Sequence, residues 1–188
     1  SLTLLPIAET QAEDISAYIP TNLISITDGQ IYLSPRLFRK GLLPALDVGR
    51  SVSRVGGKTQ LPAYRQVAGD LRLAYAQFEE LETFSRFATR LDEDSRRRIA
   101  RGQRVREVLK QPPHRTLSVP AQILALHALN QGCFDALALE EIPAAEAHLR
   151  EQAPARLSDL CQRIDRGEPL DEQDWARMTE VSQALLTP

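Results

Sequence analysis

The stretch Gly49-Arg50-Ser51-Val52-Ser53-Arg54-Val55-Gly56-Gly57 divides the chain into two parts of different character. Before it, short apolar runs alternate with turn-forming residues, and after it apolar residues recur at helical spacing. The paired glycines permit tight turns and the serines can cap local backbone groups, so we expect a loop that presents Arg54 rather than burying it. A presented guanidinium suits bidentate contact with phosphate oxygens, although a surface ion pair is the more ordinary role of a loop arginine.

The composition is that of an ordinary folded protein of one or two domains. The 188 residues carry a net charge of −2, with 43% hydrophobic and 26% charged residues, so no strong field points to DNA or an anionic membrane. No apolar run approaches the roughly 18 residues of a membrane-spanning helix, and no signal peptide is recognisable. Cys133 and Cys161 lack metal-type spacing, and we expect reduced thiols. Residues 1–7 read as a strand already under way, as expected of a piece of a longer chain.

The part before the loop predicts buried strands joined by turns. Its β-branched, apolar runs are typical of a parallel sheet, and Pro20 argues against a regular helix up to that point. A turn at Asp28-Gly29 precedes one strand, and a short helix ends at Gly41. The predicted strands are 2–8, 23–26 and 30–33, the predicted helix is 35–40, and 44–57 is predicted to be irregular.

The part after the loop predicts helices alone. One apolar stripe runs from Leu61 to about Leu91, and Asp92 is a suitable N-cap for the next helix. Gly102 is a candidate break in that helix, which we expect to end at Gln111-Pro112-Pro113. The remaining predicted helices are 119–130, 143–151, 154–165 and 171–186.

Several ordered stretches together resemble the alpha subunit of F-type ATP synthases. The resemblance covers residues 1–130 well and the rest more loosely. It rests on Ser16-Ala17-Tyr18-Ile19-Pro20-Thr21-Asn22, Ile24-Ser25-Ile26-Thr27-Asp28-Gly29-Gln30-Ile31, Ser51-Val52-Ser53-Arg54-Val55-Gly56, Val67-Ala68-Gly69, Leu71-Arg72-Leu73 and Leu109-Lys110-Gln111.

The resemblance implies a mostly α-helical chain with two domains. Residues 1–60 would be an α/β remnant, the C-terminal part of a RecA-like P-loop NTPase domain, and 61–188 the all-α helical-bundle C-terminal domain. The whole subunit would be regulatory and non-catalytic. It would alternate with beta subunits in a hexameric ring around a gamma central stalk, with delta and a peripheral stalk. It would take part in ATP synthesis coupled to proton or sodium ion flow, peripherally on the cytoplasmic face of the bacterial inner membrane, while the chain alone would be inactive.

The resemblance also gives roles to individual residues near the catalytic phosphates. Arg54 matches the arginine that reaches the phosphates of a nucleotide held mainly by the neighbouring beta subunit, the geometry of an arginine finger. Ser25 and Gly29 match positions near the same phosphates. For Ser25, a strand serine that bonds only its neighbours is an equally good interpretation.

A second nucleotide site is implied less clearly. The family's non-catalytic adenine pocket has matching positions at Pro44 and Gln111, but Leu43 and Pro113 stand where the family usually has an arginine and a second glutamine. We therefore expect adenine binding at this pocket to be weaker or of altered specificity. ATP or ADP with Mg²⁺ would be bound by the intact complex, and this chain alone is expected to hold neither.

Two interpretations from other classes of protein remain open. Arginines between Arg96 and Arg106 could bind RNA or another protein, although no aromatic residue interleaves them and acidic residues lie close by. Gly57-Lys58-Thr59 copies the end of a P-loop, but Val52 stands where the first glycine is required. No histidine has a carboxylate or thiol at metal-ligand spacing, so we predict no metal site.

Overall fold

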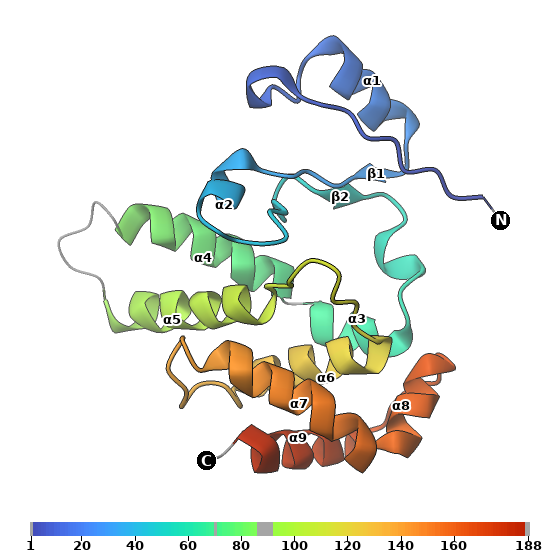
Figure 1. Cartoon of the computed structure of the whole chain (residues 1–188), viewed down its shortest axis with the longest axis vertical. Coiled ribbons are helices and arrows are strands. Elements are labelled where there is room, and N and C mark those ends of the chain that lie inside the picture. The colour runs from blue at the N-terminus through green and yellow to red at the C-terminus, as the bar shows by residue number, and fades with distance from the viewer. Residues whose placement is uncertain (1, 70, 86–91, 187–188) are drawn as a thin grey trace. The chain divides into compact units, whose positions relative to one another are not determined.

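The computed structural model describes residues 2–69, 71–85 and 92–186 (Figure 1). The chain separates into two compact units, residues 1–59 and 60–188. Helices dominate the described residues, in agreement with the mostly α-helical class predicted from the sequence. Among these residues, no helix is long and apolar enough to cross a membrane.

The described residues of the first unit form two short α-helices, two 3-10 turns and a small antiparallel sheet. Gly29 pairs with Ser53 and Gln30 with Val52, and an isolated bridge joins Leu33 to Leu46. The elements are η1 (Gln11–Glu13), α1 (Tyr18–Ile26), β1 (Gly29–Gln30), α2 (Pro35–Arg39), β2 (Val52–Ser53) and η2 (Gly56–Lys58).

Two of the predicted strands are wrong. Residues 2–8 have no regular secondary structure, and Ile7 is fully exposed, because no described strand pairs with this segment. Residues 23–26 form the last part of α1 instead of a strand. Pro20 does not prevent this helix, because it lies in the first turn, where backbone N–H groups need no intrahelical acceptor.

The other predictions for the first unit fare better. The helix at 35–40 is confirmed as α2, with Pro35 in its first turn and the Leu37 N–H directed at the Ser34 hydroxyl. The strand at 30–33 is reduced to β1 and the bridge at Leu33. Residues 44–57 are not wholly irregular, since they contain β2 and the bridge partner Leu46.

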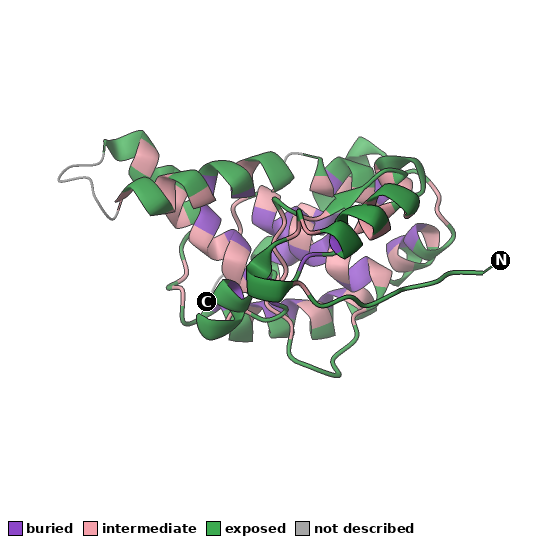
Figure 2. Cartoon of the chain, turned by 90° about the horizontal axis from the view of Figure 1, so that it is seen from above, coloured by how far each residue is buried: buried purple, intermediate pink, exposed green. Residues whose placement is uncertain are grey.

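The second unit packs around α6. Ile123 and Ala128 of this helix are fully buried, and α3, α7 and α9 all pack against it. Figure 2 colours the chain by burial and shows the buried residues, in purple, within the packed helices and exposed residues around them. The helices are α3 (Pro62–Ala68), α4 (Leu71–Ser85), α5 (Glu93–Val108), α6 (Val119–Asn130), α7 (Ile142–Arg156), α8 (Ser158–Asp165) and α9 (Glu172–Leu186).

A close contact joins α4 to α5. Gly102 lies inside α5, where a Cβ atom would come within 2.0 Å of Phe78 Cγ, so the glycine makes room for the aromatic ring. Arg106 binds both carboxylate oxygens of Glu82 at 2.7 and 2.9 Å, and its guanidinium lies 4.5 Å from the centre of the Phe78 ring. The predicted break at Gly102 is therefore wrong, and the residue serves packing between the two helices.

The helix boundaries of the second unit agree in part with prediction. The helix at 119–130 is confirmed, as is the cap of α5, where the Ser95 N–H donates to Asp92 Oδ1 at 2.6 Å. The single helix at 61–91 is wrong, since α3 ends at Ala68 and α4 begins at Leu71, and residues 86–91 lie outside the described residues. The break predicted before Pro154 is also wrong, because α7 runs through this residue to Arg156.

Candidate functional site

The loop around Arg54 is held by hydroxyl groups. Ser51 Oγ accepts from the Tyr32 N–H at 3.0 Å and donates to the Asp47 carbonyl at 2.7 Å. Ser53 Oγ accepts from the Gly56 N–H at 2.9 Å. The prediction that both serines cap local backbone groups is confirmed, and the loop is tied to neighbouring segments instead of hanging free.

Arg54 is exposed, as predicted, but its guanidinium is also anchored. Its backbone N–H donates to the Asp28 carbonyl at 2.8 Å, next to the β1–β2 pair. Its side chain reaches the last turn of α1, where Nη2 donates to the Ile24 carbonyl at 3.0 Å and Nη1 to the Ser25 carbonyl at 3.2 Å. The plane and direction of the guanidinium are therefore set by the end of a helix.

This arrangement has an electrostatic consequence. The carbonyls at the C-terminus of a helix carry partial negative charge, which would repel a phosphate brought near them. Arg54 covers two of these carbonyls with a positive charge. A guanidinium has five N–H donors, so its remaining N–H groups can still bind an anion at the outward edge, and no other side-chain bond of Arg54 occurs among the described residues.

Ser25 and Gly29 lie beside Arg54 and also have local structural roles. The Ser25 hydroxyl donates to the Asn22 carbonyl at 2.7 Å, so its contact with Arg54 runs through the backbone carbonyl. A Cβ atom at Gly29 would lie 2.3 Å from the Val52 carbonyl oxygen, so only glycine fits against β2. The structure thus brings together the three residues that the resemblance places near phosphate.

The two residues predicted for the adenine pocket belong to different units. Pro44 follows a cis peptide bond after Leu43, and its carbonyl accepts from the Leu46 N–H at 2.8 Å. Gln111 follows α5, and its Nε2 donates to the Arg115 carbonyl at 2.5 Å. The amide of Gln111 is therefore engaged within its own loop.

The segment Gly57-Lys58-Thr59 does not have the form of a P-loop. A P-loop leaves its backbone N–H groups free to bind phosphate, but here those of Lys58 and Thr59 point back to the carbonyls of Val55 and Gly56 at 3.3 Å. The segment belongs to the short helix η2 and is followed by Pro62 at the start of α3. These contacts argue against the stand-alone nucleotide-binding interpretation.

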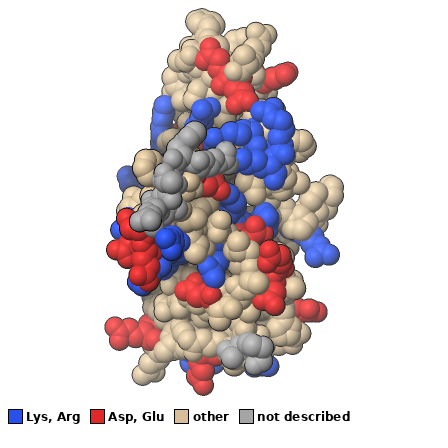
Figure 3. Space-filling view, turned by 90° about the vertical axis from the view of Figure 1, so that its left-hand side faces the viewer, with Lys and Arg blue, Asp and Glu red and all other residues tan. Residues whose placement is uncertain are grey.

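The arginines between Arg96 and Arg106 do not form one continuous surface. Arg106 is half-buried against Glu82 and Phe78, and Arg104 donates to the carbonyls of Phe134 and Asp135 at 3.1 and 2.8 Å. Arg97 pairs with Glu93. Figure 3 shows basic and acidic side chains interspersed on the face that it presents. Such a surface is poorly suited to a nucleic-acid backbone, which requires a continuous basic patch.

Sequence reasoning missed the partners of Arg54. The carbonyl of Ile24 is a backbone group, so no residue type marks it, and only recognition of α1 as a helix could have revealed the exposed carbonyls. It also missed Arg50, whose guanidinium lies 5.0 Å from the centre of the Tyr32 ring. Among the described residues, no group of His, Cys, Asp and Glu side chains could hold a metal ion.

Comparison with known proteins gives the class of this chain. Residues 60–185 match the family described as ATP synthase alpha/beta chain, C terminal domain, and residues 1–53 match the ATP synthase alpha/beta family, nucleotide-binding domain. The chain therefore belongs to the ATP synthase alpha/beta family.

Curated relatives specify the subunit that the chain resembles. Over 99% of the present chain, the sequence is 64% identical to ATP synthase subunit alpha 2 of Syntrophus aciditrophicus. Over 100% of the present chain, it is 57% identical to subunit alpha 2 of Syntrophotalea carbinolica. It is 56% identical to subunit alpha 1 of Rhodopirellula baltica over 97%. The chain spans 36% of the length of each of these relatives. The resemblance to the alpha subunit is confirmed.

Proposed function

We propose that this chain acts as part of an ATP synthase alpha subunit and supplies Arg54 to the catalytic site of an adjacent beta subunit. The observation that supports this role is the anchoring of Arg54 by the Ile24 and Ser25 carbonyls, which leaves outward N–H groups available. The reacting nucleotide, with its Mg²⁺, is a substrate held mainly by the neighbouring subunit, since Gly57-Lys58-Thr59 offers no free phosphate cradle.

The physical basis is stabilisation of the charge that spreads over the phosphoryl oxygens during transfer. A planar cation supplied across a subunit interface meets these oxygens in bidentate fashion, and such arginine fingers contribute about 10³–10⁵ in rate. An anchored guanidinium has less conformational freedom to lose when it binds, so the anchoring on α1 favours this use. The same interaction serves synthesis and hydrolysis, because both directions pass through one transition state.

Trapping of a transition-state analogue tests this proposal. In the full-length subunit assembled with beta and gamma partners, Arg54→Gln should weaken trapping of ADP with aluminium fluoride by a hundredfold or more, while ADP binding changes little. Arg50→Gln is the matched control, because Arg50 lies in the same loop but bonds to the Tyr32 hydroxyl. Equal trapping by the wild type and Arg54→Gln would overturn the role of Arg54.

The remaining parts of the proposal concern the whole subunit. It is regulatory and non-catalytic, lies in an alternating ring with beta subunits around a gamma stalk, and contacts delta and the peripheral stalk. It takes part in ATP synthesis coupled to proton or sodium ion flow at the cytoplasmic face of the bacterial inner membrane. The chain alone is inactive.

At the non-catalytic site, Leu43 and the engaged amide of Gln111 support weaker or altered adenine binding. Equilibrium dialysis of ATP with the full-length subunit checks this, and ordinary tight binding would contradict it.

A further inference from the structure

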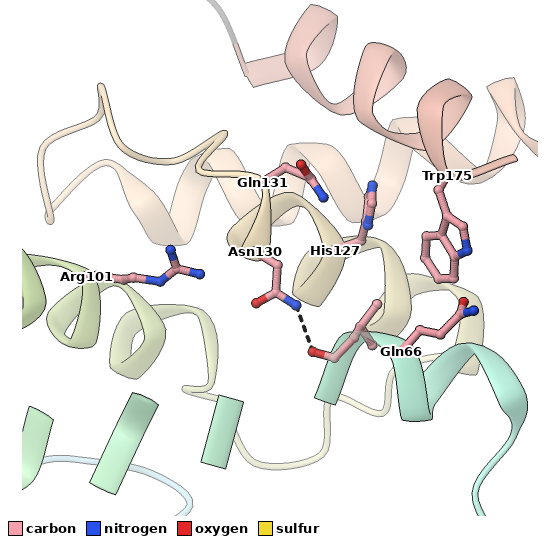
Figure 4. Close-up of a pocket in the computed structure, with 7 residues that line it drawn as sticks. Gln66, Arg101, His127, Asn130, Gln131 and Trp175 are labelled. Carbon is pink, nitrogen blue, oxygen red and sulfur yellow. Dashed lines mark hydrogen bonds between the residues drawn. The ribbon is translucent and has the colours of Figure 1, made fainter. Parts of the chain in front are cut away.

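A cavity of about 430 Å³ lies in the second unit. Its walls come from α3, α5, α6 and α9, and Figure 4 shows the side chains that line it. A volume of this size is in the range of small-molecule sites. The lining residues are Gln66, Val67, Arg101, His127, Asn130, Gln131 and Trp175.

Two rings and one aliphatic side chain, those of His127, Trp175 and Val67, form the floor of the cavity, the least polar part of its wall. Val67 and His127 are buried, and the His127 ring packs 4.9 Å from the Trp175 ring, centroid to centroid. His127 Nε2 lies 2.8 Å from the Thr179 hydroxyl. Burial lowers the pKa of His127, so the floor is uncharged at neutral pH. A flat apolar group would find a preformed surface here.

The rim is polar and carries one kind of charge. Arg101 is exposed and has no ion pair or hydrogen bond within the described part of the chain, and none of the lining residues is acidic. The amide side chains of Gln66 and Gln131 add hydrogen-bond donors. Asn130 Nδ2 donates a hydrogen bond to the Val67 carbonyl at 2.7 Å (Figure 4). The side-chain oxygen of Asn130 is left as an acceptor for a ligand in the cavity.

We infer that this cavity binds a small aromatic carboxylate, with the carboxylate at Arg101 and the ring against Trp175. The single positive charge of the lining matches one negative charge on the ligand, and the charge-assisted hydrogen bond to a guanidinium is the strongest contact on offer. The neutral floor and the ring of Trp175 select an aromatic group over a small inorganic ion. This site is independent of the role proposed for Arg54.

The chain provides its own reporter for a test, since Trp175 is the single tryptophan in the sequence. In the full chain labelled with ¹⁵N, the indole N–H resonance is followed during titration with benzoate, with benzamide and with acetate. We expect a saturable shift with benzoate below about 10 mM and at least tenfold weaker responses to benzamide, which lacks the charge, and acetate, which lacks the ring.

Two variants decide whether Arg101 holds the carboxylate. Arg101→Gln should weaken benzoate binding about tenfold or more, and it should fold normally because the side chain is exposed. Arg98→Gln removes an exposed arginine of the same helix outside the cavity, and benzoate binding should stay unchanged. An unsaturable shift, equal responses to benzoate and benzamide, or equal losses in the two variants would each overturn the inference.

Discussion

The bonds of Arg54 to the end of α1 allow its structural role to be separated from a catalytic one. Arg54→Ala removes two hydrogen bonds from a charged donor to the Ile24 and Ser25 carbonyls. Because these groups are exposed and screened by water, we expect the loss to destabilise the last turn of α1 by about 1 kcal/mol. A change of this size alters a population by roughly fivefold.

A catalytic role predicts a much larger effect. If Arg54 stabilises the charge that develops on the phosphoryl oxygens, multi-site ATP hydrolysis should fall by about 10³–10⁵. The gap between a fivefold and a thousandfold loss is wide enough for one assay to decide between the two roles.

The assay uses the full-length subunit assembled with beta and gamma partners, with turnover and nucleotide binding measured on the same preparation. Arg54→Lys keeps the positive charge but loses the planar, bidentate contact, so its turnover should lie well below that of the wild type and above that of Arg54→Ala. Turnover of Arg54→Ala within tenfold of wild type would refute the catalytic reasoning. The arginine would then serve chiefly as the C-terminal cap of α1.

Three further predictions concern the second unit. Gly102→Ala should lower the free energy of unfolding by about 1–3 kcal/mol in urea melts, because the added methyl group collides with the Phe78 ring, and Phe78→Leu should recover part of this loss; an unchanged stability would contradict the packing argument. Burial lowers the pKa of His127, so the unfolded chain binds a proton more readily, and stability should decline as pH falls below about 6.5 toward the lower folded pKa. His127→Gln should flatten this decline in melts recorded at several pH values, whereas the exposed control His148→Gln should not. Identical profiles of stability against pH for His127→Gln and the wild type would refute the role of His127. Asp92→Ala should lower the melting temperature because α5 loses its N-cap, and Asp92→Asn should retain most of the stability in the same thermal melts.

The sequence was informative where local chemistry decides the structure. Asp92 was predicted to cap α5 because an acidic side chain precedes an acidic first turn, and the structure confirms it. The loop that presents Arg54 was predicted from its glycines and serines in the same way. In each case the residues that determine the conformation lie within a few positions of one another.

The predictions failed where distant segments decide. Ile24 and Ile26 are β-branched and favour a strand locally, but they lie in the last turn of α1. Arg54, thirty residues further along the chain, donates a hydrogen bond to the Ile24 carbonyl at this helix end. Gly102 was a candidate break on propensity alone. Its role becomes clear only when Phe78 of the neighbouring helix occupies the space of the missing Cβ atom. Neither partner can be inferred from the local pattern.

The position of Arg54 couples phosphate binding to the order of a helix. The guanidinium donates to the carbonyls of Ile24 and Ser25, and a phosphate bound at its remaining N–H groups offsets the positive charge that covers the end of α1. Thermodynamic coupling is reciprocal. If phosphate binding at Arg54 changes the equilibrium between the folded and frayed last turn of α1 by some factor, then folding of that turn changes the phosphate affinity of Arg54 by the same factor. If Arg54 reaches a neighbouring site, α1 is therefore a place where the occupancy of one subunit can be sensed by another.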